Sequence, residues 1–108
     1  MDTVIVALLT FPDEETARQI ATTLVERQLA ACVNLVPGAT SVYRWQGKVC
    51  IEGEVAGLAK TTRARLPALK AAVRELHPYE CPELVAFEAA DGLDAYLDWV
   101  RESVGTQS

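Results

Sequence analysis

The spacing of hydrophobic residues changes several times along this chain, and each change predicts a different element. Thr3 to Phe11 is a continuous apolar run of strand length, which is typical of a central strand covered on both faces. Pro12 and the acidic residues that follow it are suited to the start of a helix. A helical spacing then predicts a first helix that ends near Leu29, and its apolar face is formed by Ala17, Ile20, Ala21, Leu24 and Val25.

The middle of the chain predicts a long β-hairpin. Residues 31–46 and 49–61 are extended segments with apolar residues on one side, and Gln46-Gly47-Lys48 forms the turn between them. Pro37-Gly38 predicts a bulge, because proline in a paired strand removes a ladder hydrogen bond. Both strands exceed the usual length of about six residues, so the hairpin should project beyond the sheet and require a partner.

The second half of the chain repeats the order of the first. Thr61 and Thr62 are expected to cap a second helix, whose buried stripe is formed by Leu66, Leu69, Val73 and Leu76. Glu83 to Glu88 predicts a short strand, and Asp91 is expected to cap a last helix in which Leu93, Tyr96, Leu97 and Val100 share a face. The order β-α-β-β-α-β plus a C-terminal helix predicts an α+β, ferredoxin-like fold with one bare sheet face, which favours self-association.

Composition narrows the class of protein. A length of 108 residues predicts one domain, here residues 1–104, followed by a polar tail at residues 105–108. A net charge of -5 argues against a nucleic-acid partner, and the absence of a long apolar run or a basic N-terminus argues against membrane insertion and secretion. A cytoplasmic protein with three reduced cysteines is therefore expected, because Cys32, Cys50 and Cys81 form no Cys-x-x-Cys pair.

The segment from His77 to Glu83 carries most of the candidate chemistry, because it holds the only histidine, a tyrosine, two carboxylates and a thiol between two prolines. His77 with Glu80 or Glu83, completed by water, is a candidate site for copper or another divalent cation. The alternative is a structural one, in which the prolines make a stiff connector and His77 is hydrogen-bonded to a neighbour. Cys81 lies four residues after His77, but the prolines prevent the helical geometry that would pair them.

Other residues are candidates for an interface between subunits or a ligand cleft. Tyr43, Trp45 and Trp99 are large groups with a polar end, which suits an interface first and a cleft second. Lys60 could bind an anion or pair with a carboxylate near Glu80, and Cys32 is expected to behave as a small core hydrophobe. No role is predicted for Cys50. The complete set of interface or cleft candidates is Cys32, Tyr43, Trp45, Lys60, Tyr79, Glu83 and Trp99.

Six motifs in order also carry a resemblance to a known family. They are Thr10-x-Pro12-Asp13, Ala30-Ala31-Cys32-Val33-Asn34, Pro37-Gly38-Ala39-x-Ser41-Val42-Tyr43-x-Trp45-x-Gly47-Lys48, Lys60-Thr61, His77-Pro78-Tyr79-Glu80-x-Pro82-Glu83 and Tyr96-Leu97-x-Trp99. Together they resemble the CutA divalent-cation tolerance proteins over nearly the whole chain.

The resemblance implies a ferredoxin-like subunit in a homotrimer, similar in shape to the PII signalling proteins, with long hairpins pairing across subunits. It also implies a role in tolerance to copper and other divalent cations. In some bacterial members it implies copper ligands at a cysteine that ends the first strand and at paired histidines before Pro-Tyr. Those positions are Leu9 and Leu76-His77 here, so His77 alone matches.

Three classes of function are therefore weighed. The first is a non-enzymatic trimer associated with divalent metal tolerance, which binds cations or a small ligand at clefts between subunits. The second is a structural, scaffold or signalling trimer without a physiological metal site. The third is an enzyme that uses Cys32 or Cys81 with His77, and it is disfavoured because the chain has no serine elbow, zinc-protease motif or second histidine.

Overall fold

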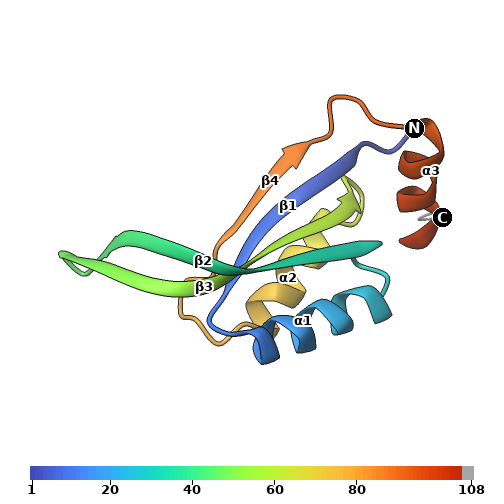
Figure 1. Ribbon diagram of the computed structural model, residues 1–108. Coiled ribbons are helices and arrows are strands. Elements are labelled where there is room, and N and C mark those ends of the chain that lie inside the picture. Colours follow the sequence, from blue (N-terminus) through green and yellow to red (C-terminus); the bar gives the residue numbers. More distant parts are fainter. Residues whose placement is uncertain (106–108) are drawn as a thin grey trace.

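The protein is an α+β sandwich in which two helices cover one face of a four-stranded antiparallel sheet (Figure 1). The computed structural model describes residues 1–105, so the last three residues of the expected polar tail lie outside it. The elements in chain order are β1 (Val4–Phe11), α1 (Glu14–Glu26), β2 (Cys32–Trp45), β3 (Lys48–Thr62), α2 (Leu66–Leu76), β4 (Leu84–Glu88) and α3 (Asp94–Ser103). The strand order is β2-β3-β1-β4, which confirms the predicted ferredoxin-like arrangement with an added C-terminal helix.

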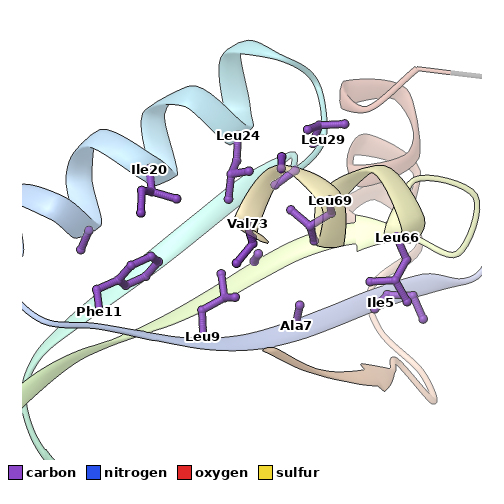
Figure 2. Packing of buried hydrophobic residues seen from close by; sticks show 14 of the residues in the cluster. Ile5, Ala7, Leu9, Phe11, Ile20, Leu24, Leu29, Leu66, Leu69 and Val73 are labelled. Carbon is purple, nitrogen blue, oxygen red and sulfur yellow. The ribbon is translucent and has the colours of Figure 1, made fainter. Parts of the chain in front are cut away.

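The core lies between the sheet and the helix pair. Alternate residues of β1, namely Ile5, Ala7, Leu9 and Phe11, point toward α1 and α2 and are almost completely buried (Figure 2). The helices contribute the residues expected from their spacing, among them Ile20, Leu24, Leu69 and Val73. The intervening residues of β1 are only half-buried, except for Val4. The prediction that β1 is covered on both faces is therefore wrong, because α1 and α2 both pack on the same side.

The long hairpin formed by β2 and β3 projects away from the helices, and the molecule extends 45 Å along its longest axis (Figure 1). Its register shifts between Val36 and Ala39, which confirms the predicted bulge. Gln46 and Gly47 both have positive φ, and Trp45 pairs with Lys48 across them, so the turn is the tight two-residue type that matches strand twist.

The start of α2 differs from the prediction. Thr61 and Thr62 still belong to β3, where they pair with Ile5 and Val4, so neither can cap a helix that begins at Leu66. The hydroxyl of Thr61 instead donates to the carbonyl oxygen of Leu29 at 2.8 Å.

The limits of the other two helices also differ from the predictions. Helix α1 ends at Glu26, three residues before the predicted end, because Gln28 adopts a positive φ that stops the helix. In α3 the N-cap is Leu93, whereas Asp91 accepts a hydrogen bond from the amide of Gly92. Leu93 therefore lies just outside the helix and is 82% exposed, while Val100 on the predicted face is fully buried.

Helix α3 lies at the end of the sheet opposite the hairpin turn (Figure 1). There Val100 of α3 and the following Val104 form a second, smaller apolar cluster with Val4 and Ala31. This cluster explains why Val4 is buried. The rest of the sheet face opposite α1 and α2 is open. Three apolar side chains on this face are about half exposed, namely Val36, Val85 and Phe87. No helix within residues 1–105 is long and apolar enough to cross a membrane.

Candidate functional site

The connector from α2 to β4 builds one wall of the candidate site. Its first residue, His77, is already extended at ψ 137° because the next residue is Pro78, and proline disfavours helical backbone before it. Pro82 restricts the other end in the same way. The connector is therefore irregular, with bends at residues 78–81, and it passes the end of β1 on its way to β4. Its stiffness stays a prediction.

His77 holds this connector to β1. It is 6% exposed, and its Nε2 lies 2.7 Å from the carbonyl oxygen of Thr10, while its Nδ1 accepts the amide of Tyr79 at 3.2 Å. Since Nδ1 is the acceptor, Nε2 carries the proton and donates to Thr10. The ring also stacks on Phe11 at 5.5 Å and contacts the Tyr79 ring at 4.6 Å. These contacts agree with the structural alternative for His77.

The same geometry bears on the predicted metal site. A histidine binds a metal ion through an unprotonated nitrogen lone pair, and in this arrangement both ring nitrogens already have partners. Glu80 is exposed on the connector. Among residues 1–105 there is no group of three or more His, Cys, Asp or Glu side chains that could hold a metal ion. The His77 and Glu80 site does not fit a metal ion without loss of a hydrogen bond, and it stays a prediction.

An open groove of about 770 Å³ lies between the connector and the hairpin. Tyr43 and Trp45 of β2 and Tyr79 of the connector contribute aromatic surface to it. Glu80 and Glu83 also line it, so the structure brings five of the predicted site residues together at one place. We call this feature the acidic groove.

The groove is acidic because the hairpin supplies two more carboxylates, Glu52 and Glu54. No lysine, arginine or histidine belongs to its lining in the part of the chain that the structure describes. Both glutamates lie two residues apart on β3, so their side chains point to the same face of the hairpin. Their alternation with Ile51 and Val55 is that of the polar side of any strand, so the sequence alone gives no signal of a site here.

Two tyrosine hydroxyls orient the hairpin carboxylates. Tyr79 Oη donates to Glu54 Oε2 at 2.8 Å, and Tyr43 Oη donates to Glu52. Burial raises the pKa of the Tyr79 phenol, and the hydrogen bond to Glu54 and the negative charges of Glu54 and Glu52 raise it further. Tyr79 is therefore a neutral hydrogen-bond donor under physiological conditions.

The remaining candidates lie elsewhere. Lys60 donates to the side chain of Asn34 on the open face of the sheet, and Cys32 lies beside the same amide at 3.9 Å. Cys32 is half-buried and belongs to neither apolar cluster, so its assignment to the core is wrong. Trp99 packs against Tyr96 on α3 at 5.6 Å, and burial together with the Cys32 thiol raises the pKa of Tyr96. These side chains do not line the acidic groove.

The other two cysteines are also separated from a histidine partner. Cys50 is half-buried on β3 and its thiol points toward the carbonyl of Lys48 at 4.0 Å. Cys81 is exposed and lines the acidic groove, whereas His77 is buried behind the groove with both nitrogens in use. This arrangement does not present a thiol and a histidine as a pair.

Comparison with known proteins agrees with the fold and with the motifs. The family model described as CutA1 divalent ion tolerance protein matches residues 5–103. A relative from Thermus thermophilus, called divalent-cation tolerance protein CutA, is 56% identical over 100 residues, which are 93% of this chain and 97% of that protein. Human protein CutA is 46% identical over 96 residues, or 89% of this chain, and the matched region is 54% of the human protein. The chain thus spans about half the length of that relative.

Solved structures give the same result. The structure of a divalent cation tolerance protein from Thermus thermophilus superposes with a TM-score of 0.92 and 55% identity, covering 94% of this chain and 99% of that one. The match includes the hairpin, the connector and α3, because it spans almost the whole of both chains. The chain belongs to the CutA family.

Proposed function

We propose that this protein acts in tolerance to divalent cations as a non-enzymatic homotrimer. The observation that carries the proposal is the match to the CutA1 family model from residue 5 to residue 103, together with the name of the Thermus relative. Copper is the first cation to test, because it heads the affinity order of divalent ions for nitrogen and oxygen ligands. The proposal places the protein in the cytoplasm, which cell fractionation would test.

Self-association is supported by the open face of the sheet. Phe87 is 55% exposed, Val85 is 46% exposed and Val36 is 51% exposed, and all three lie on the face that α1 and α2 leave bare. The strands β2 and β4 form the two unpaired edges of the sheet. Exposed apolar surface and free edges of this kind are normally covered by another chain.

The assembly is tested by measuring the mass of the protein in solution. We expect three chains for the native protein and smaller species for Phe87→Lys, because a charge on the bare face cannot be buried in an interface. Val25→Lys is the matched control, since Val25 is an exposed apolar residue on α1, at 42% exposure. A native monomer at micromolar concentration, or equal effects of both substitutions, would contradict the trimer.

The cellular role is tested by deleting the gene and measuring growth across a series of copper, zinc and cobalt concentrations. Growth should become more sensitive to at least one cation and should be restored by the native gene. Restoration by a Cys32→Ala, Cys81→Ala double variant is expected if no thiol chemistry is involved. Unchanged tolerance after deletion would leave the second candidate, a structural or signalling trimer, which the bracing role of His77 favours.

Direct binding of metal is tested by isothermal titration of Cu²⁺ and Zn²⁺ into the native protein and into Glu80→Gln. Because His77 has no free nitrogen, we expect no tight binding that depends on Glu80. Tight binding that is lost in Glu80→Gln would instead support the predicted site and would require the His77 ring to exchange one of its hydrogen bonds for the metal.

A further inference from the structure

Lys60 is the one charged side chain on the open face of the sheet between the bulge and α3. In the antiparallel ladder it pairs with Cys32 on β2 and with Val6 on β1, and Val6 pairs in turn with Phe87 on β4. Neither a carboxylate nor another cation occupies the other paired positions of this face, which are residues 4, 6, 8 and 10 of β1, 32, 34 and 36 of β2, 56, 58 and 62 of β3, and 85 and 87 of β4. A single ammonium group therefore lies among neutral, mostly apolar side chains.

The charge of Lys60 is not neutralised within one chain. Its ammonium group donates to the side-chain oxygen of Asn34, which carries no net charge. The ion pairs found among residues 1–105 are all made by arginines, and none involves Lys60. A charged donor is matched fully only by a charged acceptor, so the contact with Asn34 leaves the site one negative charge short.

Assembly of the protein would take Lys60 out of water. It is already only partly exposed in the single chain, and the half-exposed Val85 and Phe87 lie on the same face. If another copy covers this face, as the proposed self-association requires, the ammonium group becomes part of an interface. Burial of a charge is strongly unfavourable unless an opposite charge and hydrogen bonds accompany it. An anion is therefore expected at Lys60 in the assembled protein, and this expectation rests on the proposed function.

The side chains around Lys60 offer donors to such an anion. The oxygen of Asn34 accepts from both Lys60 and the Cys32 thiol, so the amide nitrogen keeps its two N–H donors. Tyr96 of α3 lies beside the same thiol, and burial raises the pKa of its phenol, which is therefore a neutral O–H donor. A cation surrounded by neutral donors from three elements is an arrangement that suits an oxyanion.

A buried hydroxyl on the same face also lacks a partner. Thr62 lies two residues beyond Lys60 on β3, roughly 7 Å along the strand, and is 1% exposed. Within residues 1–105 its Oγ1 is the only buried side-chain nitrogen or oxygen without a hydrogen bond. Such orphaned groups are rare in folded proteins, and they indicate a polar group that comes from outside the chain. This observation is independent of the charge of Lys60 and concerns the same part of the sheet.

We propose that Lys60, Asn34 and Tyr96 form a site for an oxyanion, a carboxylate or phosphate group, at the interface between two copies of the chain. Lys60 supplies the charge, and the amide and phenol supply hydrogen bonds that select an oxygen ligand over chloride. A free small anion and a carboxylate side chain of the neighbouring copy share this chemistry, and the experiment distinguishes the two sources.

The free anion is tested by thermal unfolding of the intact protein while inorganic phosphate replaces chloride at constant ionic strength. The melting temperature of the native protein should rise with the phosphate concentration. Lys60→Met should weaken this phosphate effect at least about tenfold, because charge-assisted hydrogen bonds are lost, and Lys60→Arg should keep it. The matched control is Lys70→Met, which removes an exposed lysine on α2 and should respond as the native protein does.

The neighbouring carboxylate is tested by the solution mass of the same proteins. If it is the source, phosphate has no specific effect, and Lys60→Met dissociates at a chain concentration at least about tenfold higher than the native protein does. A Lys60→Met protein that assembles as tightly as the native protein, with a phosphate response equal to that of Lys70→Met, would overturn the site. A native monomer would instead refute the proposed self-association, so the two failures are distinguishable.

A second variant keeps the lysine and supplies the anion from within the chain. Asn34→Asp places a carboxylate on the Lys60 ammonium group, which removes the need for an external oxyanion and repels one. The phosphate response should vanish, or the assembly should weaken if a neighbouring carboxylate was the source. An Asn34→Asp protein with the native phosphate response and the native mass would contradict the proposal.

Discussion

Replacing His77 with alanine will destabilise the fold, and this effect separates a bracing histidine from a metal ligand. The substitution leaves the carbonyl oxygen of Thr10 and the amide of Tyr79 without their ring partners. An unsatisfied buried polar group costs about 1–3 kcal/mol, and the lower half of that range applies here because both contacts are only partly buried. The lost ring contacts with Phe11 and Tyr79 contribute about 1–2 kcal/mol more. We therefore expect a loss of about 3–6 kcal/mol in the free energy of unfolding.

His77→Phe divides this loss into its parts, because phenylalanine keeps an aromatic ring but has no nitrogen. It should retain most of the stacking on Phe11 and lose about 2–4 kcal/mol, the share of the two hydrogen bonds. Both variants are compared with the native protein by denaturant unfolding followed by circular dichroism, at one fixed chain concentration, since the stability of an oligomer depends on concentration. Losses under about 1 kcal/mol, accompanied by lost copper binding, would refute the bracing role.

Three further predictions concern positions that the structure explains individually. Gly57→Ala should lose about 1–3 kcal/mol of stability in denaturant unfolding, because its new Cβ would lie 2.8 Å from Phe11 Cε2. The control Gly53→Ala, whose Cβ would have nothing within 4 Å, should change stability little. Equal losses in the two variants would contradict the packing argument. The pKa of Tyr79 is raised above its ordinary value of 10.0, so the contribution of its hydroxyl to stability is fully present below about pH 10 and is lost as the pH rises toward the folded-state pKa. The stability difference between the native protein and Tyr79→Phe should therefore shrink above about pH 10, and a constant difference would count against a buried, carboxylate-bonded phenol. The hydrogen bond from the Thr16 amide lowers the pKa of Asp13 below 3.8. The stabilisation that Asp13→Ala removes should therefore be present at neutral pH and disappear as the pH falls through that lowered pKa. Thermal unfolding of both proteins at several pH values would measure this difference.

Local patterns predicted those parts of the fold in which one residue and its neighbours decide the outcome. Strand β1 and helix α1 follow from apolar spacing alone, and the bulge at Pro37-Gly38 follows from the chemistry of proline. The caps were predicted wrongly because tertiary pairing competes with local preference. Thr62 has a good capping side chain, but its backbone is paired with Val4, and the helix begins only after that strand has ended.

The role of His77 could be narrowed from the sequence but not decided. Its surroundings indicated either a metal ligand or a brace, and the difference depends on Thr10, which is 67 positions away in the chain. The coverage of helix α3 could not be predicted for a related reason. Its period is clear, but the helix packs on the end of the sheet through a narrow stripe around Val100, so Leu93 is largely exposed and Tyr96 is only partly covered. Periodicity predicts which residues share a face, and only packing determines how much of that face is covered.

The sequence indicated two of the four carboxylates that line the acidic groove and gave no signal for the other two. Glu80 and Glu83 are conspicuous because they lie in the proline-rich connector beside His77, whereas Glu52 and Glu54 resemble the solvent side of any strand. Folding brings the two pairs to one groove. The two pairs of carboxylates meet only in the folded chain, and the complete hydrogen bonding of the His77 ring makes that histidine the brace of the connector that carries one of the pairs.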